Sequence, residues 1–377
     1  MKYPKASTLL IVTLGLVSCS TGSAASPTSQ VAALPPTPTQ TAETTAPSSS
    51  TSASASTSTS SSTSTSSAPA TTTTIAPTPV MPLTGMPITD PTIAAQPAVV
   101  IKVSNDPGAR PQSGLNSADI VFEAWGAGPT RFATVFQSTD APTVGPIRSG
   151  RTQDVDLVGE FNGPVFACSG GNPTVVTTLR NSDLQVVTES QGPGWRLDPH
   201  RRRPHATFND PASLRLNADP TRTGPSQQFH YRQAGQAATG DASAGFNLHI
   251  ELVHAQWRYN PQTNRYERSQ DGGPHLLADG SQVTFDNVVV MWINYDHSFA
   301  DARSPDGGSI GTGQALVFSG GKVTTGTWTR DDRLKPISFT DASGAPMLLT
   351  PGSTWIELAN TGQGLFPGTD ELEVLPG

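Results

Sequence analysis

The stretch DIVFEAWGAGPTRFATVFQ, residues 119–137, decides the fold expected for the first half of the chain. Two apolar runs, 119–125 and 131–137, flank the turn-forming residues GAGPT. Strand-forming residues on both sides of a Gly/Pro turn are typical of a β-hairpin. Working outward from this hairpin gives the organisation expected for the rest of the chain.

One strand is expected before the hairpin and helices after it. Residues Ala98–Val103 form a short β-branched run, typical of a buried strand. Residues 153–161 have helical spacing, and Asn172-Pro173 and Asp210-Pro211 each put an N-cap residue before a proline suited to the first helical position. These signals predict an α/β or α+β domain over residues 81–232.

The second half carries strand signals without helix signals. A polar, Gly- and Ala-rich piece at 233–244 is expected to be a linker. Beyond it, Val288–Ile293 indicates a central strand, and two runs around Gly320-Gly321 indicate a hairpin. Short strands separated by turns at this spacing predict a mainly antiparallel β domain over residues 245–377.

The chain begins with the features of a bacterial lipoprotein signal peptide. Lys2 and Lys5 precede a short apolar run, which is too short to span a bilayer. The residues LVSC at 16–19 resemble a lipobox, in which the cysteine takes a diacylglycerol and becomes the new N-terminus. We expect residues 1–18 to be removed and Cys19 to anchor the protein to the outer face of the cell membrane. The alternative is an ordinary signal peptide with an incidental cysteine.

Residues 19–80 are expected to be a disordered tether. Beyond Cys19 they are almost entirely Ser, Thr, Ala and Pro, and Glu43 is their only charged residue. Such a composition cannot bury enough apolar surface to offset the entropy of ordering. The Ser/Thr tracts also resemble O-glycosylated stalks, so both a bare and a glycosylated spacer remain open.

Charge and motif content narrow the classes of function. Without Lys2 and Lys5 the chain has 21 basic and 30 acidic residues, a formal charge of −9, which argues against nucleic acid as a partner. Cys168, in the apolar run PVFACSG, is expected to pack as a small buried residue. The sequence holds no P-loop, dinucleotide fingerprint, C-x-x-C, G-x-S-x-G or H-E-x-x-H motif, so we expect neither a cofactor nor a metal.

Charged residues that could carry chemistry gather in two places, the stretch 110–151 and the loop 198–205. Asp119 and Glu123 share one face of their strand, because strand side chains alternate. If the hairpin pairs as expected, Arg131 comes within reach of Glu123. The candidate residues for ligand binding or catalysis are Arg110, Asp119, Glu123, Arg131, Arg148, Arg151 and His205.

We expect Glu123, Arg131, Arg148, Arg151 and His205 to converge in space. A buried charge must be paired and hydrogen-bonded, and mutual compensation would leave spare guanidinium donors for a ligand. The planar fork of arginine suits carboxylate and phosphate groups, and a histidine can act as general acid or base. The alternative is a buried ion-pair network that only fixes the fold. The histidines of the second half are expected to be scattered surface or strand residues: His249, His254, His275 and His297.

Several separate motifs resemble one known family, the YerB-like bacterial lipoproteins. In the first half these are PLTGMPITDP, RPQSGLNSADIVFEAW, TRFATVFQS, VGPIRSGR and PHATFND. In the second half they are DNVVVMWIN, GTGQALVFSGGK, TWTR and LTPGSTWIEL. The family is one of unknown function, so the resemblance implies a two-part fold and membrane anchoring and assigns no activity. The long Ser/Thr tether departs from many members of the family.

Two classes of function compete. The first is a binding or scaffold protein that holds a cell-wall glycan, a peptide or an anionic group in the pocket of arginines and acids. The second is a cell-wall glycan hydrolase or lyase that uses Glu123 or Asp119 with His205. Two acids four residues apart on a strand lie about 13 Å apart. Two-carboxylate glycosidases need roughly 5 to 9.5 Å. This separation favours the binding role.

Overall fold

The computed structural model describes residues 79–189 and 191–377. These described residues belong to one compact unit. The predictions of a signal peptide and of lipidation at Cys19 lie outside the described residues, as does the tether predicted over 19–80 apart from its last two residues. Of these two, Val80 forms a β-bridge with Pro87, so ordered structure is present slightly before the predicted end of the tether. Across 79–189 and 191–377, none of the helices has the length and apolar character that crossing a membrane requires.

The first half of the described chain combines short strands with shorter helices. Its strands are β1 (Val99–Ser104), β2 (Ile120–Ala124), β3 (Arg131–Phe136), β4 (Val165–Cys168), β5 (Gln185–Thr188), β6 (Arg196–Leu197) and β7 (Thr207–Phe208). Its helices are α1 (Pro91–Ala95), α2 (Asp154–Leu157), α3 (Pro173–Arg180) and α4 (Pro211–Arg215), with 3-10 turns η1 (Pro107–Ala109), η2 (Leu115–Ser117) and η3 (Gly159–Phe161).

Several local predictions for this half are confirmed. The strands β2 and β3 form the antiparallel hairpin expected around GAGPT. The side chain of Asn172 accepts the N–H of Thr174 at the start of α3, and Asp210 accepts that of Ser213 at the start of α4. The helix expected over 153–161 is shorter, a single turn followed by a 3-10 turn, because Val158 leaves the helical conformation.

The second half is built from strands. They are β8 (Asp241–Ile250), β9 (Val253–Asn260), β10 (Arg265–Gln270), β11 (Gly273–Pro274), β12 (Thr284–Phe285), β13 (Asn287–Ile293), β14 (Tyr295–Ser298), β15 (Asp301–Gly307), β16 (Gly311–Ser319), β17 (Lys322–Arg330), β18 (Ser338–Asp341), β19 (Thr354–Asn360) and β20 (Glu371–Pro376). The hairpin expected around Gly320-Gly321 is confirmed as β16 and β17. Both glycines have positive φ, 59° and 72°, a conformation that glycine adopts without steric cost.

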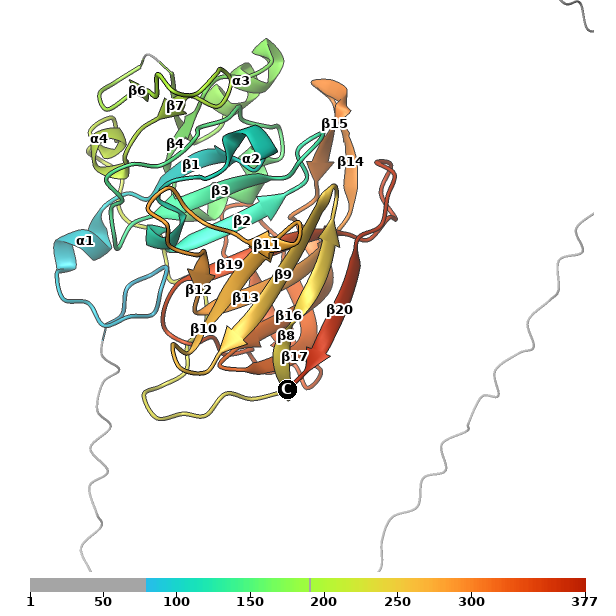
Figure 1. Cartoon of the computed structure of the whole chain (residues 1–377). Coiled ribbons are helices and arrows are strands. Elements are labelled where there is room, and N and C mark those ends of the chain that lie inside the picture. Colours follow the sequence, from blue (N-terminus) through green and yellow to red (C-terminus); the bar gives the residue numbers. More distant parts are fainter. Residues whose placement is uncertain (1–78, 190) are drawn as a thin grey trace, which may run out of the picture. The chain divides into compact units, whose positions relative to one another are not determined.

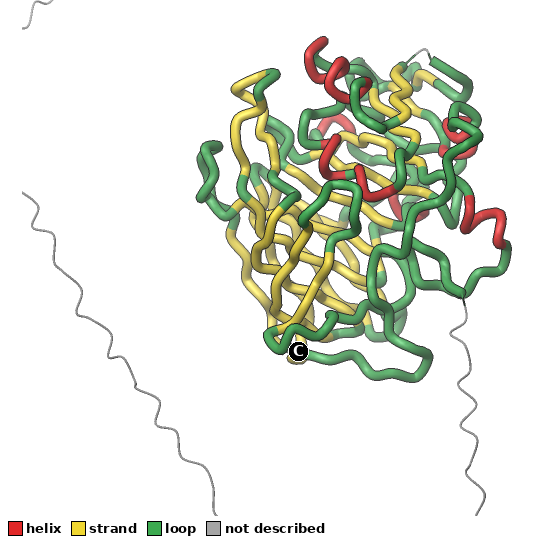
Figure 2. Tube along the Cα trace, turned by 180° about the vertical axis from the view of Figure 1, so that it is seen from behind, coloured by secondary structure: helices red, strands yellow, loops and turns green. Residues whose placement is uncertain are grey.

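One 16-stranded sheet runs through both halves (Figure 1). Its order is β11-β10-β9-β8-β17-β16-β13-β19-β2-β3-β1-β4-β5, and β12, β18 and β20 add to β10, β17 and β8. The described chain is therefore mostly β, and Figure 2 shows its few helices gathered around the end formed by the first half. The division at 233–244 stays a prediction, but the sheet continues across it.

The junction between the halves is parallel. Strand β19 pairs in parallel with β13 on one side and with β2 on the other. All seven residues of β19 are buried. The ring of Trp355 on β19 packs edge-on against Phe132 of β3 and Trp257 of β9, at centroid distances of 5.0 and 5.4 Å. Because these three rings come from both halves, the hydrophobic core is shared between them.

Register places the polar residues of the β2–β3 hairpin on two different faces. Arg131 lies opposite Ala124 of β2 and Ser104 of β1, whereas Phe132 lies opposite Glu123 and Val103. Residues directly opposite in an antiparallel pair point to the same side, so Glu123 and Arg131 point to opposite sides of the sheet. The face that carries Glu123 meets the second half, and the face that carries Arg131 meets α2 and the loop before it.

Candidate functional site

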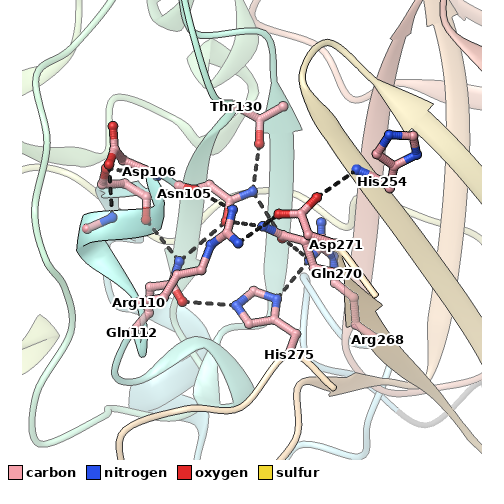
Figure 3. A network of polar contacts seen from close by, with 12 residues as sticks. Asn105, Asp106, Arg110, Gln112, Thr130, His254, Arg268, Gln270, Asp271 and His275 are labelled. Atoms are coloured by element: carbon pink, nitrogen blue, oxygen red, sulfur yellow. Dashed lines mark hydrogen bonds and ion pairs between the residues drawn. The ribbon is translucent and has the colours of Figure 1, made fainter. Parts of the chain in front are cut away.

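A polar network with a buried centre joins the two halves on the Glu123 face (Figure 3). Arg268 of β10 is 0% exposed and donates to Glu123 at 2.7 Å. Glu123 also accepts from the side chains of Asn105, at 3.1 Å, and Thr130. The guanidinium of Arg268 lies 5.1 Å from the centroid of the Trp355 ring, which adds a cation–π contact.

Two glutamates share this one arginine. Glu123 and Glu357 lie opposite each other on the parallel strands β2 and β19. Glu357 accepts from the indole N–H of Trp257 at 2.8 Å, and its Oε1 lies 3.9 Å from Nε of Arg268. Burial, and then the neighbouring charge of Glu123, raise the pKa of Glu357 well above its usual value. The raised pKa favours the protonated form of Glu357, and in that form Arg268 and Glu123 are a matched pair of charges.

His275 belongs to this network, so the expectation of a surface or strand position for it is wrong. It is 4% exposed, its Nδ1 lies 2.8 Å from Nη1 of Arg268, and its Nε2 lies 2.9 Å from Oε1 of Gln112. Burial and the charge of Arg268 lower its pKa well below the usual value. The neutral ring accepts from Arg268 and donates to Gln112, so it carries no charge to compensate.

The expected pairing of Glu123 with Arg131 is wrong, because the register puts the two side chains on opposite faces of the sheet. Arg268 takes the place of Arg131. The five-residue convergence is also wrong as stated, since Glu123 lies in the closed network. On the other face, Arg131, Arg148 and Arg151 are close enough for their charges to act on one another, and His205 is close enough to Arg148 to be affected by its charge.

We call Arg131, Arg148 and Arg151 the arginine cluster. Arg131 begins β3 and is 9% exposed, while Arg148 and Arg151 lie in the loop before α2 and are partly exposed. Nη1 of Arg131 donates to the carbonyl oxygen of Ser149 at 3.0 Å, and Nη2 of Arg151 donates to that of Gly126 at 3.0 Å. The loop is held in place because the backbone N–H of Arg148 donates to the carbonyl oxygen of Lys102 in β1, at 2.8 Å.

No carboxylate of residues 79–189 and 191–377 lies within 4.0 Å of a guanidinium nitrogen of the arginine cluster. The buried acid Asp154, three residues after Arg151, is already paired with Lys102 at 2.8 Å, and both side chains are fully buried. Burial, and then the charges of Arg151 and Arg148, lower the pKa of Arg131 to about 9. Because arginine side chains stay protonated at neutral pH, positive charge accumulates here.

His205 lies at the edge of the arginine cluster. Its Nε2 is 3.5 Å from Oδ1 of Asp106, and its Nδ1 is shielded from solvent without a hydrogen-bond partner among the described residues. Burial lowers its pKa, the charge of Asp106 raises it, and that of Arg148 lowers it again. His205 is therefore close to Arg148 and is mostly neutral at pH 7.

The other two candidate residues lie elsewhere. Arg110 pairs with Asp271 of the second half at 2.8 Å, at the outer end of the network in Figure 3. Asp119 precedes β2 and accepts the backbone N–H groups of Gln137 and Ser138, at 2.6 and 2.9 Å. Burial raises the pKa of Asp119 to about 6. Both residues fasten chain segments together and lie apart from the arginine cluster.

Glu251 is an acid near the arginine cluster that the sequence did not reveal. It lies in the turn between β8 and β9 and accepts the N–H groups of Gly126 and Gly128, at 2.9 and 3.1 Å. Burial raises its pKa to about 7, although the charge of Arg131 opposes this. Glu251 thus holds the β2–β3 turn of the first half against the second half.

Some of the missed residues left a trace in the sequence. Lys102 is a lone charge in the apolar run Ala98–Val103, and Glu357 is a lone acid in the buried strand β19. A charge in a fully buried strand needs a partner, so both positions could have been singled out. Arg268 gave no such signal, because charged residues surround it in RYERSQ, and neither did Glu251 at a turn.

We expect Arg268→Met to lower the free energy of unfolding by about 3 to 5 kcal/mol, because it leaves the buried charge of Glu123 without a partner. The measurement is urea denaturation. Arg303→Met serves as the matched control, since Arg303 is 93% exposed, and should change the value by less than about 0.5 kcal/mol. Adding Glu123→Gln to Arg268→Met should recover part of the loss. A loss below about 1 kcal/mol for Arg268→Met alone would contradict this.

The raised pKa of Glu251 predicts that the stability of the protein depends on pH. Its pKa in the folded protein, about 7, lies above the unfolded value, so the folded state binds the extra proton between about pH 4.3 and pH 7. Stability from this group is therefore present at low pH and is lost as pH rises through 7. The measurement is the free energy of unfolding from urea denaturation, for Glu251→Gln and for wild type, at pH 5 and at pH 8. The value for the variant minus that for wild type should be higher at pH 8 than at pH 5 by on the order of 1 to 3 kcal/mol. A constant difference across this range would show that Glu251 is ionised throughout.

Comparisons with known proteins agree with this architecture. Residues 83–224 match the family model described as the N-terminal domain of a protein of unknown function, DUF3048, and residues 247–356 match its C-terminal domain. The YerB protein of Bacillus subtilis strain 168, named as a lipoprotein, is 28% identical over 291 residues, which cover 74% of this chain and 85% of YerB.

The fold also resembles a solved one. The crystal structure of the YerB protein from Bacillus subtilis matches with a TM-score of 0.65 and 24% identity, covering 78% of this chain and 99% of that one. The two family models, the sequence of YerB and its fold all match this chain. The chain therefore belongs to the YerB-like (DUF3048) family.

Proposed function

We propose that this chain is a lipid-anchored envelope protein whose arginine cluster binds an anionic group of a cell-envelope ligand. One observation carries the proposal. Arg131, Arg148 and Arg151 lie together, partly or largely buried, and no carboxylate of the described residues comes within 4.0 Å of their guanidinium groups. Buried positive charge that the protein leaves uncompensated is stabilised by an anion from solution.

The chemistry of the site favours phosphate or carboxylate over other anions. Arg131 donates one N–H group to the carbonyl oxygen of Ser149, and Arg151 donates two, to those of Gly150 and Gly126, which hold both side chains in orientation. Their remaining donors, and all five of Arg148, suit the paired oxygens of a phosphate or carboxylate. His205 beside Arg148 could add one more donor to such a group. Charge-assisted hydrogen bonds of this kind contribute about 1.5 to 3 kcal/mol each.

The competing role as a glycan hydrolase gains no support from the acids proposed for it. Glu123 is 0% exposed and hydrogen-bonded to Arg268 and two neutral side chains. Asp119 is 3% exposed and engaged with the backbone N–H groups of Gln137 and Ser138. A general acid must reach the atom to which it gives its proton, and these two buried carboxyl groups do not reach the surface. We therefore assign them a role in stabilising the fold.

Anchoring at Cys19 supports a role at the membrane. The lipobox-like residues LVSC at 16–19 fit a lipidated N-terminus, and YerB is named as a lipoprotein. Two acyl chains on one residue give stable attachment, whereas one chain gives marginal binding. The tether of Ser, Thr, Ala and Pro would let the folded part reach ligands away from the lipid surface.

The anion proposal is tested with inorganic phosphate, pyrophosphate and citrate by isothermal titration calorimetry. We expect Arg148→Ala to weaken binding about ten- to hundredfold, the equivalent of one charge-assisted contact, and to leave stability within about 1 kcal/mol. Arg180→Ala at the exposed end of α3 is the matched control and should bind as wild type does. The proposal fails if none of the three anions binds, or if Arg180→Ala weakens binding as much as Arg148→Ala.

The anchor is tested by fractionation of cells that express Cys19→Ser. Loss of the thiol prevents transfer of the diacylglycerol, so we expect the variant to leave the membrane fraction, while wild type stays in it. Cys168→Ser is the control, because that thiol is 0% exposed and lies inside the folded part. If Cys19→Ser remains in the membrane fraction, another feature of the chain holds the protein there.

A further inference from the structure

A cavity of about 630 Å³ lies at the carboxyl ends of β13 and β19. These two strands are parallel, and their last residues, Ile293 and Asn360, lie opposite each other. The loops that follow neighbouring parallel strands diverge, which opens a crevice at that edge of a sheet. The polar and aromatic residues that line it include Trp292, Asn294, Asp296, Gln314, Thr361 and Gln363.

One wall of the cavity is braced by two tryptophans. The indole N–H of Trp328 on β17 donates to the carbonyl oxygen of Trp292 on β13 at 2.8 Å. Gly313 of β16 lies against this contact, and a Cβ there would come within 2.5 Å of Nε1 of Trp328 and 2.6 Å of the Trp292 oxygen. The absence of a side chain at Gly313 therefore allows the Trp328 indole to reach the carbonyl oxygen of Trp292.

Several polar groups of the lining keep free hydrogen-bonding capacity. Oδ1 of Asn294 accepts the hydroxyl of Thr361, which leaves the amide N–H groups of Asn294 without a partner among the described residues. Oδ1 of Asp296 accepts the N–H of Leu365 at 2.7 Å, which leaves its second oxygen. The indole N–H of Trp292 is shielded from solvent and has no acceptor within the described residues.

We propose that this cavity binds a neutral saccharide residue. A sugar ring has apolar C–H faces and an edge of hydroxyl groups, each of which donates and accepts. An indole suits the faces, and fixed amide and carboxylate groups suit the hydroxyls. The volume lies within the roughly 300 to 1,000 Å³ of small-ligand sites.

Two other occupants fit less well. Asp296 is the only charged side chain among the lining residues, so the cavity does not attract anions. A peptide cannot add as an extra strand, because β13 is already paired with β16 on one side and β19 on the other.

The cavity is also separate from the arginine cluster. Gln153 lies between them, accepting from the N–H of Gly307 at 2.7 Å and donating to the carbonyl oxygen of Trp125.

The test uses the full chain in detergent with four neutral tetrasaccharides, built from β-linked N-acetylglucosamine, β-linked glucose, α-linked glucose and β-linked mannose. Binding is followed by tryptophan fluorescence and by saturation-transfer NMR. At least one sugar should bind saturably, with a dissociation constant of about 1 mM or lower. Trp292→Ala should weaken that binding at least tenfold, and Gln314→Ala, on an exposed side chain, should weaken it by a smaller factor.

Trp195→Ala is the matched control, because Trp195 is also partly exposed but lies in the first half outside the cavity. It should bind the sugars as wild type does. If Trp292→Ala does not fold, sugar binding is compared between Gln314→Ala and wild type instead. The proposal is overturned if none of the four sugars binds, if both cavity variants bind like wild type, or if a blocked, uncharged tetrapeptide binds there in their place. Phosphate binding at the arginine cluster is measured separately, so either proposal can fail alone.

Discussion

The structure depends on one ion pair, between Arg268 of the second half and Glu123 of the first, both without any exposure to solvent. Such a pair depends on further hydrogen bonds to its remaining donors and acceptors, because both charges have lost their hydration. Asn105 and Thr130 of the first half bond to Glu123, and His275 and Gln270 of the second half bond to Arg268, so these bonds come from both halves. Nε of Arg268 and Oε2 of Glu357 have no hydrogen-bond partner among the described residues. The constraint explains why the sheet runs unbroken through β19 and why neither half closes its own core.

The same hairpin that supplies Glu123 turns Arg131 to the other face of the sheet, and the charge balance differs between the two faces. On the Glu123 face each charge has a counterpart. On the other face Lys102 has its partner in Asp154, while the arginine cluster has none within 4.0 Å among residues 79–189 and 191–377. A fold that matches its buried charges on one side and leaves three guanidinium groups unmatched on the other is suited to bind an anion there.

Local features of the fold followed from the sequence, whereas the pairing between halves did not. Turn residues and caps predicted the β2–β3 hairpin, α3, α4 and the β16–β17 hairpin, since neighbouring residues determine these elements. The alternation rule was right, yet the partner of Glu123 was wrong, because Arg268 lies 145 residues away. Of the candidate site, the proximity of Arg131, Arg148, Arg151 and His205 was predicted. Glu251 was missed because a turn position shows no periodicity.

The central claim is that the arginine cluster carries uncompensated charge that an anion occupies. Crystals of the protein grown with tungstate, a heavy analogue of phosphate, test it most directly through anomalous scattering. The account predicts one peak whose oxygens lie about 2.7 to 3.0 Å from guanidinium nitrogens of at least two of Arg131, Arg148 and Arg151. A site without tungstate, in which Arg131 or Arg148 instead pairs with Glu251 or Asp154, would contradict it.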